Sequence, residues 1–270
     1  MLEWLRVVVK GGGDIASGAA HRLHRAGMRV VVTELKQPMT IRRAVSFASA
    51  VYDREVVVDG VAARLVNDED QIGDMHEKGI IPVVVDPSAS IVQRLGAEAL
   101  VDGIMGKRNL GTRMSDAPVV IGLGPGFTAG VDVHAVIETC RGHYLGKVIT
   151  DGTALADTGV PGEIEGHTLD RVLWAPRSGR FVGSARIGDR VQAGDVLARV
   201  SGEPLRARID GVLRGILHDG LDVKNGQKVG DVDPRGIVDH CFTISDKARA
   251  VGGGVLEAIL HLLPEASGPR

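Results

Sequence analysis

The stretch WAPRSGRFVGSARIGDRVQAGDVLARV (residues 174–200) is followed by a second stretch, RARIDGVLRGILHDGLDVKNGQKVGDV (residues 206–232), with the same pattern of glycine and apolar residues. Glycines and apolar residues of the first stretch have counterparts thirty-two positions later in the second. Gly179, for example, corresponds to Gly211. A fixed internal offset indicates a duplicated structural unit. Within each half, short apolar runs alternate with turns of the Gly-Asp and Asn-Gly type, which favour positive φ. The sequence therefore predicts two related halves built from short strands.

Two such halves, related by a pseudo-twofold axis, would form a flattened β-sandwich, and the pattern resembles the biotinyl/lipoyl barrel-sandwich hybrid. In carriers of that type, the hairpin that joins the halves presents a modified lysine. The joining segment here, residues 201–205, reads SGEPL and contains no lysine. We therefore expect residues 169–236 to form an all-β barrel-sandwich-hybrid domain that lacks the modified lysine.

The composition excludes several classes of function. Of the 270 residues, 44% are apolar and 24% are charged, which suffices for one large or two modest domains. A net charge of −2 and few aromatic residues argue against a nucleic-acid partner. No apolar run approaches the roughly 20 residues of a membrane helix, and the first residues lack the plan of a signal peptide. Two cysteines far apart do not form a disulfide framework. We expect a soluble, cytoplasmic protein without a membrane partner.

Residues 5–33 predict a strand, a glycine turn, a helix and a second strand, typical of a Rossmann-like nucleotide-binding sheet. The spacing G-x-G-x-x-A in the turn and an acidic residue after the second strand match the dinucleotide-binding pattern. Amides at the helix N-terminus would face a pyrophosphate, and Glu34 would accept hydrogen bonds from ribose hydroxyls. Alternatively, the glycines only let the helix pack close to its strand, and the charge of Asp14 would repel a nearby phosphate. The candidates here are Gly11, Gly12, Gly13, Asp14, Ala16 and Glu34.

Polar residues and a second glycine loop follow several later strands of the predicted sheet. The loop, residues 122–130, comes after a predicted strand at 117–121, and we expect a helix after it with Asp132 in its first turn. Ligands bind at the carboxyl ends of strands in open α/β sheets, so these residues predict a shared cleft. The alternative for each polar residue alone is loop solvation or turn capping. For Arg42 and Arg43 the alternative is a solvated basic turn. The candidates are Arg42, Arg43, Asp86, Asp102, Lys107, Asn109, Gly124 and Gly126.

The segment ETCRGH (residues 138–143) holds a carboxylate, a thiol and an imidazole. One hypothesis is a thiol that handles sulfur or selenium, activated by Arg141 or His143. The competing interpretation, which we favour, is a helix end in which Cys140 is a small buried residue. Arg141 and His143 remain candidates for lining the cleft. Cys241 follows a histidine but lacks further ligands at metal spacing, so we expect no metal site.

The last part of the chain predicts a helix capped by Ser245. The three glycines at 252–254 would each cost about 1 kcal/mol inside a helix. Either this helix packs with its backbone close to the first domain, or a new helix begins at Gly254. The expected plan is a Rossmann-like cofactor-binding domain (1–150), a linker (151–168), the barrel-sandwich hybrid (169–236) and a C-terminal segment that packs on the first domain (237–264).

Several of these stretches resemble the YqeB-type selenium-dependent molybdenum hydroxylase system proteins and, more distantly, the xanthine dehydrogenase accessory proteins. The resemblance extends over nearly the whole chain and implies an accessory protein that helps to mature the cofactor of molybdenum hydroxylases. It implies a pathway without assigning a reaction, so the question of an enzymatic activity stays open. The stretches that carry it are residues 10–18, 33–34, 41–47, 107–112, 122–132, 136–139, 141–146 and 243–256.

From this resemblance we expect a molybdopterin nucleotide as the cofactor, bound in the cleft at the strand ends. The partners it implies are an apo molybdenum hydroxylase and selenium-delivery proteins, and a homo-oligomer stays open. Two alternatives remain. One is an NAD-dependent oxidoreductase, because an acidic Glu34 suits NAD better than NADP. The other is a docking protein with no bound cofactor, in which the sandwich binds the partner.

Overall fold

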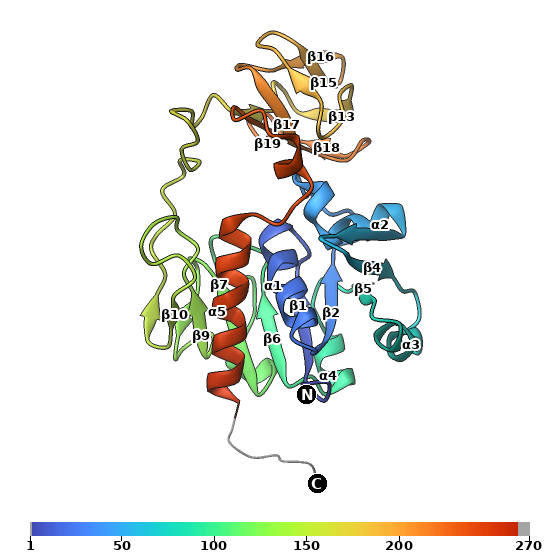
Figure 1. The fold of residues 1–270 in the computed structure, drawn as a ribbon, viewed down its shortest axis with the longest axis vertical. Coiled ribbons are helices and arrows are strands. Elements are labelled where there is room, and N and C mark those ends of the chain that lie inside the picture. Colours follow the sequence, from blue (N-terminus) through green and yellow to red (C-terminus); the bar gives the residue numbers. More distant parts are fainter. Residues whose placement is uncertain (1, 264–270) are drawn as a thin grey trace.

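Nine strands form one sheet in the lower lobe of the computed structural model, which describes residues 2–263 (Figure 1). The outer ends of the expected plan, residues 1 and 264, lie outside the described residues. The strand order is β10-β9-β7-β6-β1-β2-β5-β4-β3. These strands are β1 (Arg6–Lys10), β2 (Arg29–Glu34), β3 (Glu55–Val58), β4 (Val61–Leu65), β5 (Ile81–Val85), β6 (Ala99–Asp102), β7 (Val119–Leu123), β9 (Ala135–Ile137) and β10 (Val148–Ile149).

Helices cover both faces of this sheet, which explains why its central strands are almost continuously apolar. One face packs on the two longest helices, and the other on two short ones. In Figure 1 the long helices cross the front of the sheet side by side. The helices are α1 (Asp14–Arg25), α2 (Ala50–Asp53), α3 (Gln71–Glu77), α4 (Ile91–Leu95) and α5 (Asp246–Leu262), with 3-10 turns at Arg43–Val45, Phe47–Ser49, Met114–Asp116 and Val238–Cys241.

Helix α5 brings the end of the chain back onto the sheet lobe, beside α1. It is one continuous helix, and the Ser245 hydroxyl caps it by accepting a hydrogen bond from the amide of Ala248. A side chain at Gly252 would lie 2.8 Å from the carbonyl oxygen of Gly18, whereas one at Gly253 would meet no atom of residues 2–263 within 4 Å. Close packing of the backbone therefore explains Gly252 but not Gly253, and no new helix begins at Gly254.

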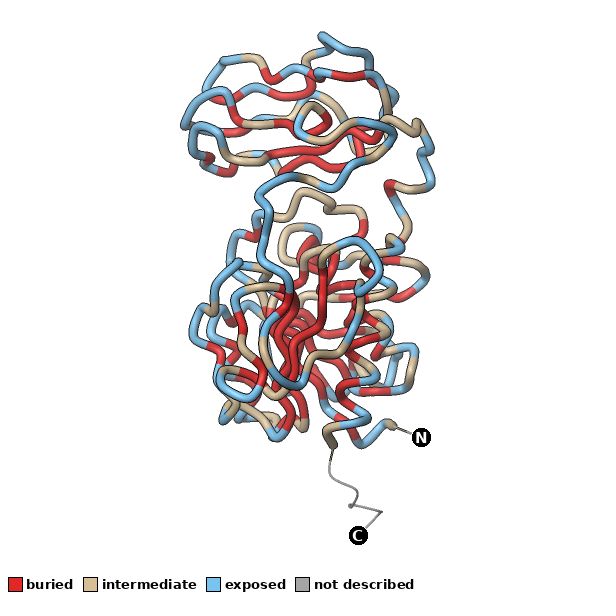
Figure 2. Tube along the Cα trace, turned by 90° about the vertical axis from the view of Figure 1, so that its left-hand side faces the viewer, coloured by how far each residue is buried: buried red, intermediate tan, exposed pale blue. Residues whose placement is uncertain are grey.

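The upper lobe contains the repeated stretches, which form two four-stranded antiparallel sheets. The orders are β12-β19-β17-β14 and β16-β15-β13-β18, so each sheet takes two strands from each half of the repeat. Buried apolar residues of both halves form a core separate from those of the lower lobe, and Figure 2 shows buried residues in the upper lobe apart from those of the lower one. The strands are β12 (Val172–Trp174), β13 (Gly179–Gly183), β14 (Arg190–Val191), β15 (Val196–Val200), β16 (Glu203–Arg206), β17 (Gly211–Ile216), β18 (Asp222–Val223) and β19 (Lys228–Asp233).

The expected fold class, a Rossmann-like sheet with a biotinyl/lipoyl-like barrel-sandwich hybrid, is wrong. The large sheet is mixed, because β3 and β10 run antiparallel to their neighbours β4 and β9. Its strands β6, β7 and β9 also follow one another without the crossover helices of a doubly wound sheet. The upper lobe consists of two four-stranded antiparallel sheets. The β-α-β pattern at the start of the chain is local, and it does not specify how distant strands extend the sheet.

The helix expected after the second glycine loop is also wrong. Residues 128–137 form β8 (Thr128–Ala129) and β9, and β8 pairs with β11 (Gly152–Thr153). Asp132 does not begin a helix, but accepts a hydrogen bond from the amide of Thr128 within a turn. The segment that follows, residues 138–143, is a loop rather than a helix end. A short apolar run fits a strand and a buried helix equally well, so the sequence pattern alone could not distinguish them.

The two lobes contact each other through the segment that follows β2. Ile41 accepts a backbone hydrogen bond from Ile216, and Arg43 Nε donates to the carbonyl oxygen of Ile216 at 2.7 Å. The ring of His218 stacks on that of Tyr52, with 4.1 Å between the ring centroids. Among the residues the structure describes, no helix is long and apolar enough to span a membrane.

Candidate functional site

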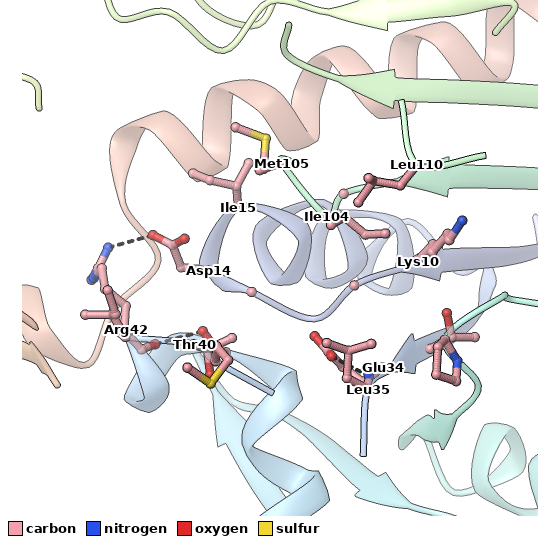
Figure 3. Close-up of a pocket in the computed structure, with 18 of the residues that line it drawn as sticks. Lys10, Asp14, Ile15, Glu34, Leu35, Thr40, Arg42, Ile104, Met105 and Leu110 are labelled. Carbon is pink, nitrogen blue, oxygen red and sulfur yellow. Dashed lines mark hydrogen bonds and ion pairs between the residues drawn. The ribbon is translucent and has the colours of Figure 1, made fainter. Parts of the chain in front are cut away.

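A cleft of about 550 Å³ lies at the carboxyl ends of β1, β2, β5 and β6, beneath the upper lobe (Figure 3). This volume is in the range of pockets that hold small ligands and cofactors. Four connections between strands and helices build its walls, and β19 of the upper lobe completes it. The lining residues are Lys10, Gly11, Gly13, Asp14, Ile15, Thr33, Glu34, Leu35, Met39, Thr40, Ile41, Arg42, Ser46, Asp86, Pro87, Gly103, Ile104, Met105, Leu110, Lys228 and Asp231.

The first glycine loop and the N-terminus of α1 form one wall of the cleft. Gly11 adopts a positive φ of 88°, and a side chain at Gly12 would lie 2.7 Å from the amide nitrogen of Ala48. Both positions therefore require glycine. Gly13 is different, because its φ is −65° and the nearest atom to an added side chain is 3.8 Å away. Among the residues that the structure describes, no side chain caps the helix at this end, so its first amides are free to bind a ligand.

Glu34 tightens the same loop from the end of β2. Its carboxylate accepts hydrogen bonds from the amides of Gly12, at 2.8 Å, and Leu35, at 2.7 Å. Burial raises the pKa of Glu34, although these two hydrogen bonds oppose the shift. The carboxylate still lines the cleft, where it can accept a further hydrogen bond from a ligand hydroxyl or amino group.

Asp14 and Arg42 form an ion pair at the mouth of the cleft (Figure 3). The distance from Arg42 Nη1 to Asp14 Oδ2 is 3.5 Å, and Arg42 Nη2 also donates to the backbone carbonyl of His240. The guanidinium partly neutralises the carboxylate that the sequence places beside the helix N-terminus. Arg42 therefore reduces the repulsion between Asp14 and a bound phosphate.

Lys10, Asp102 and Thr112 form a buried chain of polar groups at the bottom of the cleft. Lys10 Nζ donates to Thr112 Oγ1 at 3.2 Å, and the Thr112 hydroxyl donates to Asp102 at 2.6 Å. Asn109 holds the backbone of this turn by accepting hydrogen bonds from the amides of Gly111 and Thr112. Asp102 and Asn109 therefore shape the site without lining it.

Asp86 lines the cleft but also caps α4. Its carboxylate accepts hydrogen bonds from the hydroxyls of Ser88 and Ser90 and from the amide of Ile91. Burial alone would raise the pKa of Asp86, but these hydrogen bonds outweigh burial and lower it. Asp86 is therefore an ionised acceptor whose orientation is fixed by the helix that it caps.

Of the candidates from the sequence, Gly11, Gly13, Asp14, Glu34, Arg42 and Asp86 line this cleft together. The remaining candidates do not line it. Ala16 is buried under Gly103, and Arg43 bonds to the upper lobe. Lys107 pairs with Asp157 of the linker. The others that lie outside the cleft are Gly12, Asp102, Asn109, Gly124, Gly126, Arg141 and His143.

Arg141 and His143 lie in the loop between β9 and β10. Arg141 forms a two-pronged ion pair with Asp246 in the first turn of α5, and this partner holds the pKa of Asp246 at about 2. His143 packs edge-on against the ring of Tyr144. Cys140 is half-buried in this loop, and Cys241 is buried against the upper lobe. Neither thiol lines the cleft.

The sequence reasoning missed the apolar walls of the cleft. Leu35 and Met39 lie on one wall, and Ile104 and Leu110 lie on another, and all four are large side chains that stay exposed. Exposed apolar residues gathered around one opening are typical of a binding site. Leu35 and Leu110 directly follow the predicted site residues Glu34 and Asn109, and this adjacency was the sequence feature that could have identified them. No local pattern could have placed Lys228 of the other lobe at the same cleft.

The fold and this cleft define a two-lobed α/β protein with a pocket at the carboxyl edge of its parallel strands. The chain is 51% identical over 257 residues to the "Uncharacterized protein YqeB" of Escherichia coli strain K12. The alignment covers 95% of this chain and 48% of that protein, so the chain spans about half the length of this relative. The similarity supports the YqeB part of the resemblance and says nothing of molybdenum or selenium.

No family model matches the chain. Weak structural matches include the product-bound ectoine utilization protein EutE (DoeB) from Ruegeria pomeroyi, with a TM-score of 0.26, 15% identity, and coverage of 84% of this chain and 85% of that one. Another is an aspartoacylase family protein from Mesorhizobium loti, with a TM-score of 0.28, 14% identity, and coverage of 84% of each chain. TM-scores this low do not establish a shared fold.

Proposed function

We propose that this chain binds a nucleotide-type cofactor in the cleft at the first glycine loop. The observation that carries the proposal is the uncapped N-terminus of α1, which opens with Gly13 into a cleft at the carboxyl ends of four neighbouring parallel strands. Free amides at such a terminus attract anions, and phosphate is the anion that nucleotides offer there.

The rest of the lining suits the other parts of a nucleotide. Glu34 and Asp86 provide carboxylate oxygens for ribose hydroxyls or for the amino groups of a base. Leu35 and Met39 on one wall, and Ile104 and Leu110 on another, provide apolar surfaces for a flat ring. Phosphate, sugar and ring therefore each have groups of matching chemistry within one cleft.

The resemblance to YqeB-type proteins makes a molybdopterin nucleotide the specific cofactor of this proposal. The free amides of α1 and the carboxylate of Glu34 would hold its phosphate and hydroxyl groups. The cofactor itself would supply the molybdenum-binding sulfurs, and the chain would shelter it before delivery to an apo molybdenum hydroxylase. Neither Cys140 nor Cys241 lines the cleft, which argues against direct sulfur or selenium transfer from their thiols to a bound cofactor.

NAD remains a second candidate because of one observation, the acidic Glu34 at the end of β2. In dinucleotide-binding proteins, an acidic residue at that place accepts hydrogen bonds from the adenosine ribose. Both oxygens of Glu34 already accept backbone amides here, so the ribose of either nucleotide would share an acceptor. Because the resemblance to YqeB-type proteins favours the molybdopterin nucleotide, an NAD-dependent oxidoreductase is the weaker proposal.

Native mass spectrometry tests the proposal, with the chain purified from a molybdopterin-producing host and then offered NAD, cytidine monophosphate and molybdopterin cytosine dinucleotide in turn. We expect a bound nucleotide that Gly13→Val removes, because valine fits the φ of −65° but projects into the cleft. Gly73→Val is the matched control, since Gly73 lies on α3 with nothing within 4 Å of an added side chain. Binding of none of the three compounds would contradict the proposal, and preference for NAD would favour the oxidoreductase.

A further inference from the structure

The lining of the cleft includes two polar side chains, Lys10 and Thr33, that have no role in forming the glycine loop. Lys10 pairs with Thr33 across β1 and β2, and with Asp102 across β1 and β6. Partners in parallel strands lie at the same level and project to the same face. The three side chains therefore stand in a row at the carboxyl edge, on the face that α3 and α4 cover.

Lys10 is a buried ammonium with unused hydrogen-bonding capacity. Only 7% of Lys10 is exposed, although the residue lines the cleft. An ammonium has three donors, and within the described residues one of them binds Thr112 Oγ1 while Asp102 lies farther off at 3.9 Å. A buried charge with so few partners is stabilised by any further acceptor that reaches it.

Thr33 carries a second unused group, on the strand that pairs with that of Lys10. Its residue is 1% exposed, and across residues 2–263 its hydroxyl oxygen has no hydrogen-bond partner. Buried hydroxyls in native proteins are nearly always bonded, so an unbonded one at the wall of a cleft indicates a missing partner. Lys10 and Thr33 both offer a proton, and the group that accepts from both is an oxygen with negative charge.

We propose that Lys10 and Thr33 form an anion subsite, which takes a phosphate or carboxylate group of the ligand at the bottom of the cleft. Thr112 and Asp102 act as positioning residues, because they hold the ammonium at one end of a hydrogen-bonded chain. This inference rests on the proposed function and extends it. The ligand then carries two anionic groups, one at the amides of α1 and one here, on either side of the Gly11–Gly13 loop.

Calorimetric titration with inorganic pyrophosphate, inorganic phosphate and malonate tests the subsite, in parallel with the nucleotides used above. Lys10→Met removes the charge and keeps the length of the side chain, and Thr33→Val removes the hydroxyl and keeps the shape. We expect the Kd of pyrophosphate to rise about tenfold or more in Lys10→Met and about threefold or more in Thr33→Val. Lys78→Met, an exposed position beyond α3, is the control and leaves the Kd unchanged. Binding of phosphate without malonate identifies a phosphate site, and the reverse identifies a carboxylate site.

The outcomes separate the subsite from the proposed function. Unchanged binding of nucleotides and of all three anions in both variants overturns the subsite and leaves the nucleotide proposal intact. Pyrophosphate binding that depends on Lys10, in a protein that binds no nucleotide, supports the subsite and overturns the nucleotide. Absence of binding of all three anions to the wild type overturns the subsite. Thermal melting checks each variant, and where Lys10→Met fails to fold, Thr33→Val alone decides.

Discussion

The first glycine loop, residues 10–18, opens into the cleft at Gly13, whereas at Gly126 of the second loop, residues 122–130, neighbouring backbone occupies the space that a side chain would need. The first loop leads into α1, whose amides are uncapped, and the second leads into β8. An added side chain at Gly13 would meet its nearest atom at 3.8 Å, but one at Gly126 would lie 2.6 Å from the amide nitrogen of Arg108. Gly13 therefore leaves open space at the cleft, whereas Gly126 is required by the packing of the chain.

The largest effect on stability is expected from Gly126→Ala, in the second loop. Gly126 has a φ of +112°, and its added methyl group would overlap the backbone at Lys107 and Arg108. We expect a loss of about 3 kcal/mol or more in the free energy of unfolding, because conformational strain and overlap act together. Urea denaturation measures it. A loss below about 1 kcal/mol would show that the second loop is not tightly packed and would weaken the comparison.

The glycines of α5 provide a matched pair that tests the same distinction inside one helix. Gly252→Ala brings a methyl group 2.8 Å from the carbonyl oxygen of Gly18, so we expect a loss of about 2 kcal/mol. Gly253→Ala meets nothing within 4 Å and gains up to about 1 kcal/mol from helix propensity. Thermal melting of both variants checks this. Equal shifts in the same direction would contradict the packing of α5 on α1.

Asn109→Ala tests the turn at residues 109–112. In this turn, the side chain of Asn109 holds the backbone of Thr112, whose hydroxyl bonds to Lys10. The side chain of Asn109 accepts from the amides of Gly111 and Thr112 and donates to the carbonyl oxygen of Thr112. Loss of these three hydrogen bonds is expected to cost about 1–2 kcal/mol in unfolding free energy. Asn109→Asp keeps the two accepting bonds and serves as the control. Unchanged stability together with lost ligand affinity would instead make Asn109 a direct ligand contact.

The smallest effect is expected from Asp246→Asn, which breaks the ion pair with Arg141 beside the second loop. Arg141 lowers the pKa of Asp246 in the folded state from 3.8 to about 2. A lowered pKa favours folding above the unfolded value, so the contribution is complete above about pH 5, shrinks as the pH falls from 5 to 2 and is lost below the folded-state pKa. The side chain of Asp246 is 70% exposed, so we expect less than about 1 kcal/mol at neutral pH. Unfolding measured from pH 1 to pH 7 checks it, and a difference that does not shrink as the pH falls below 4 would exclude the ion pair as its cause.

The sequence predicted the local elements of the site better than the global arrangement. The strand–turn–helix–strand unit around Gly11 and Glu34 has a strong local pattern, because glycine spacing and apolar runs are set by neighbours in the chain. The mixed sheet was not predictable in this way, since β3 and β10 join it through contacts between distant residues. The strand at Ala135–Ile137 was mistaken for a helix because three apolar residues carry too little periodicity.

The residues of the cleft were likewise predictable only where they belong to a local sequence pattern. Gly13 and Glu34 belong to one recognisable local pattern, whereas Arg141 was a candidate because it lies in a stretch that resembles the YqeB-type proteins, and it pairs with α5 instead. Lys10 was passed over because a lysine at the end of a strand has no distinctive pattern. Its burial beside Thr33 appears only when β1 and β2 are brought together.

The most direct test of the difference between the two loops is a proton–nitrogen correlation spectrum of the labelled protein during titration with NAD, cytidine monophosphate and pyrophosphate. We predict saturable shifts of the amide signals of Gly11 to Ile15 and of Leu35 with at least one of these compounds, while the signals of residues 122–130 stay in place. Shifts confined to the second glycine loop, or no shift in either loop, would contradict the assignment of the first loop as the binding site.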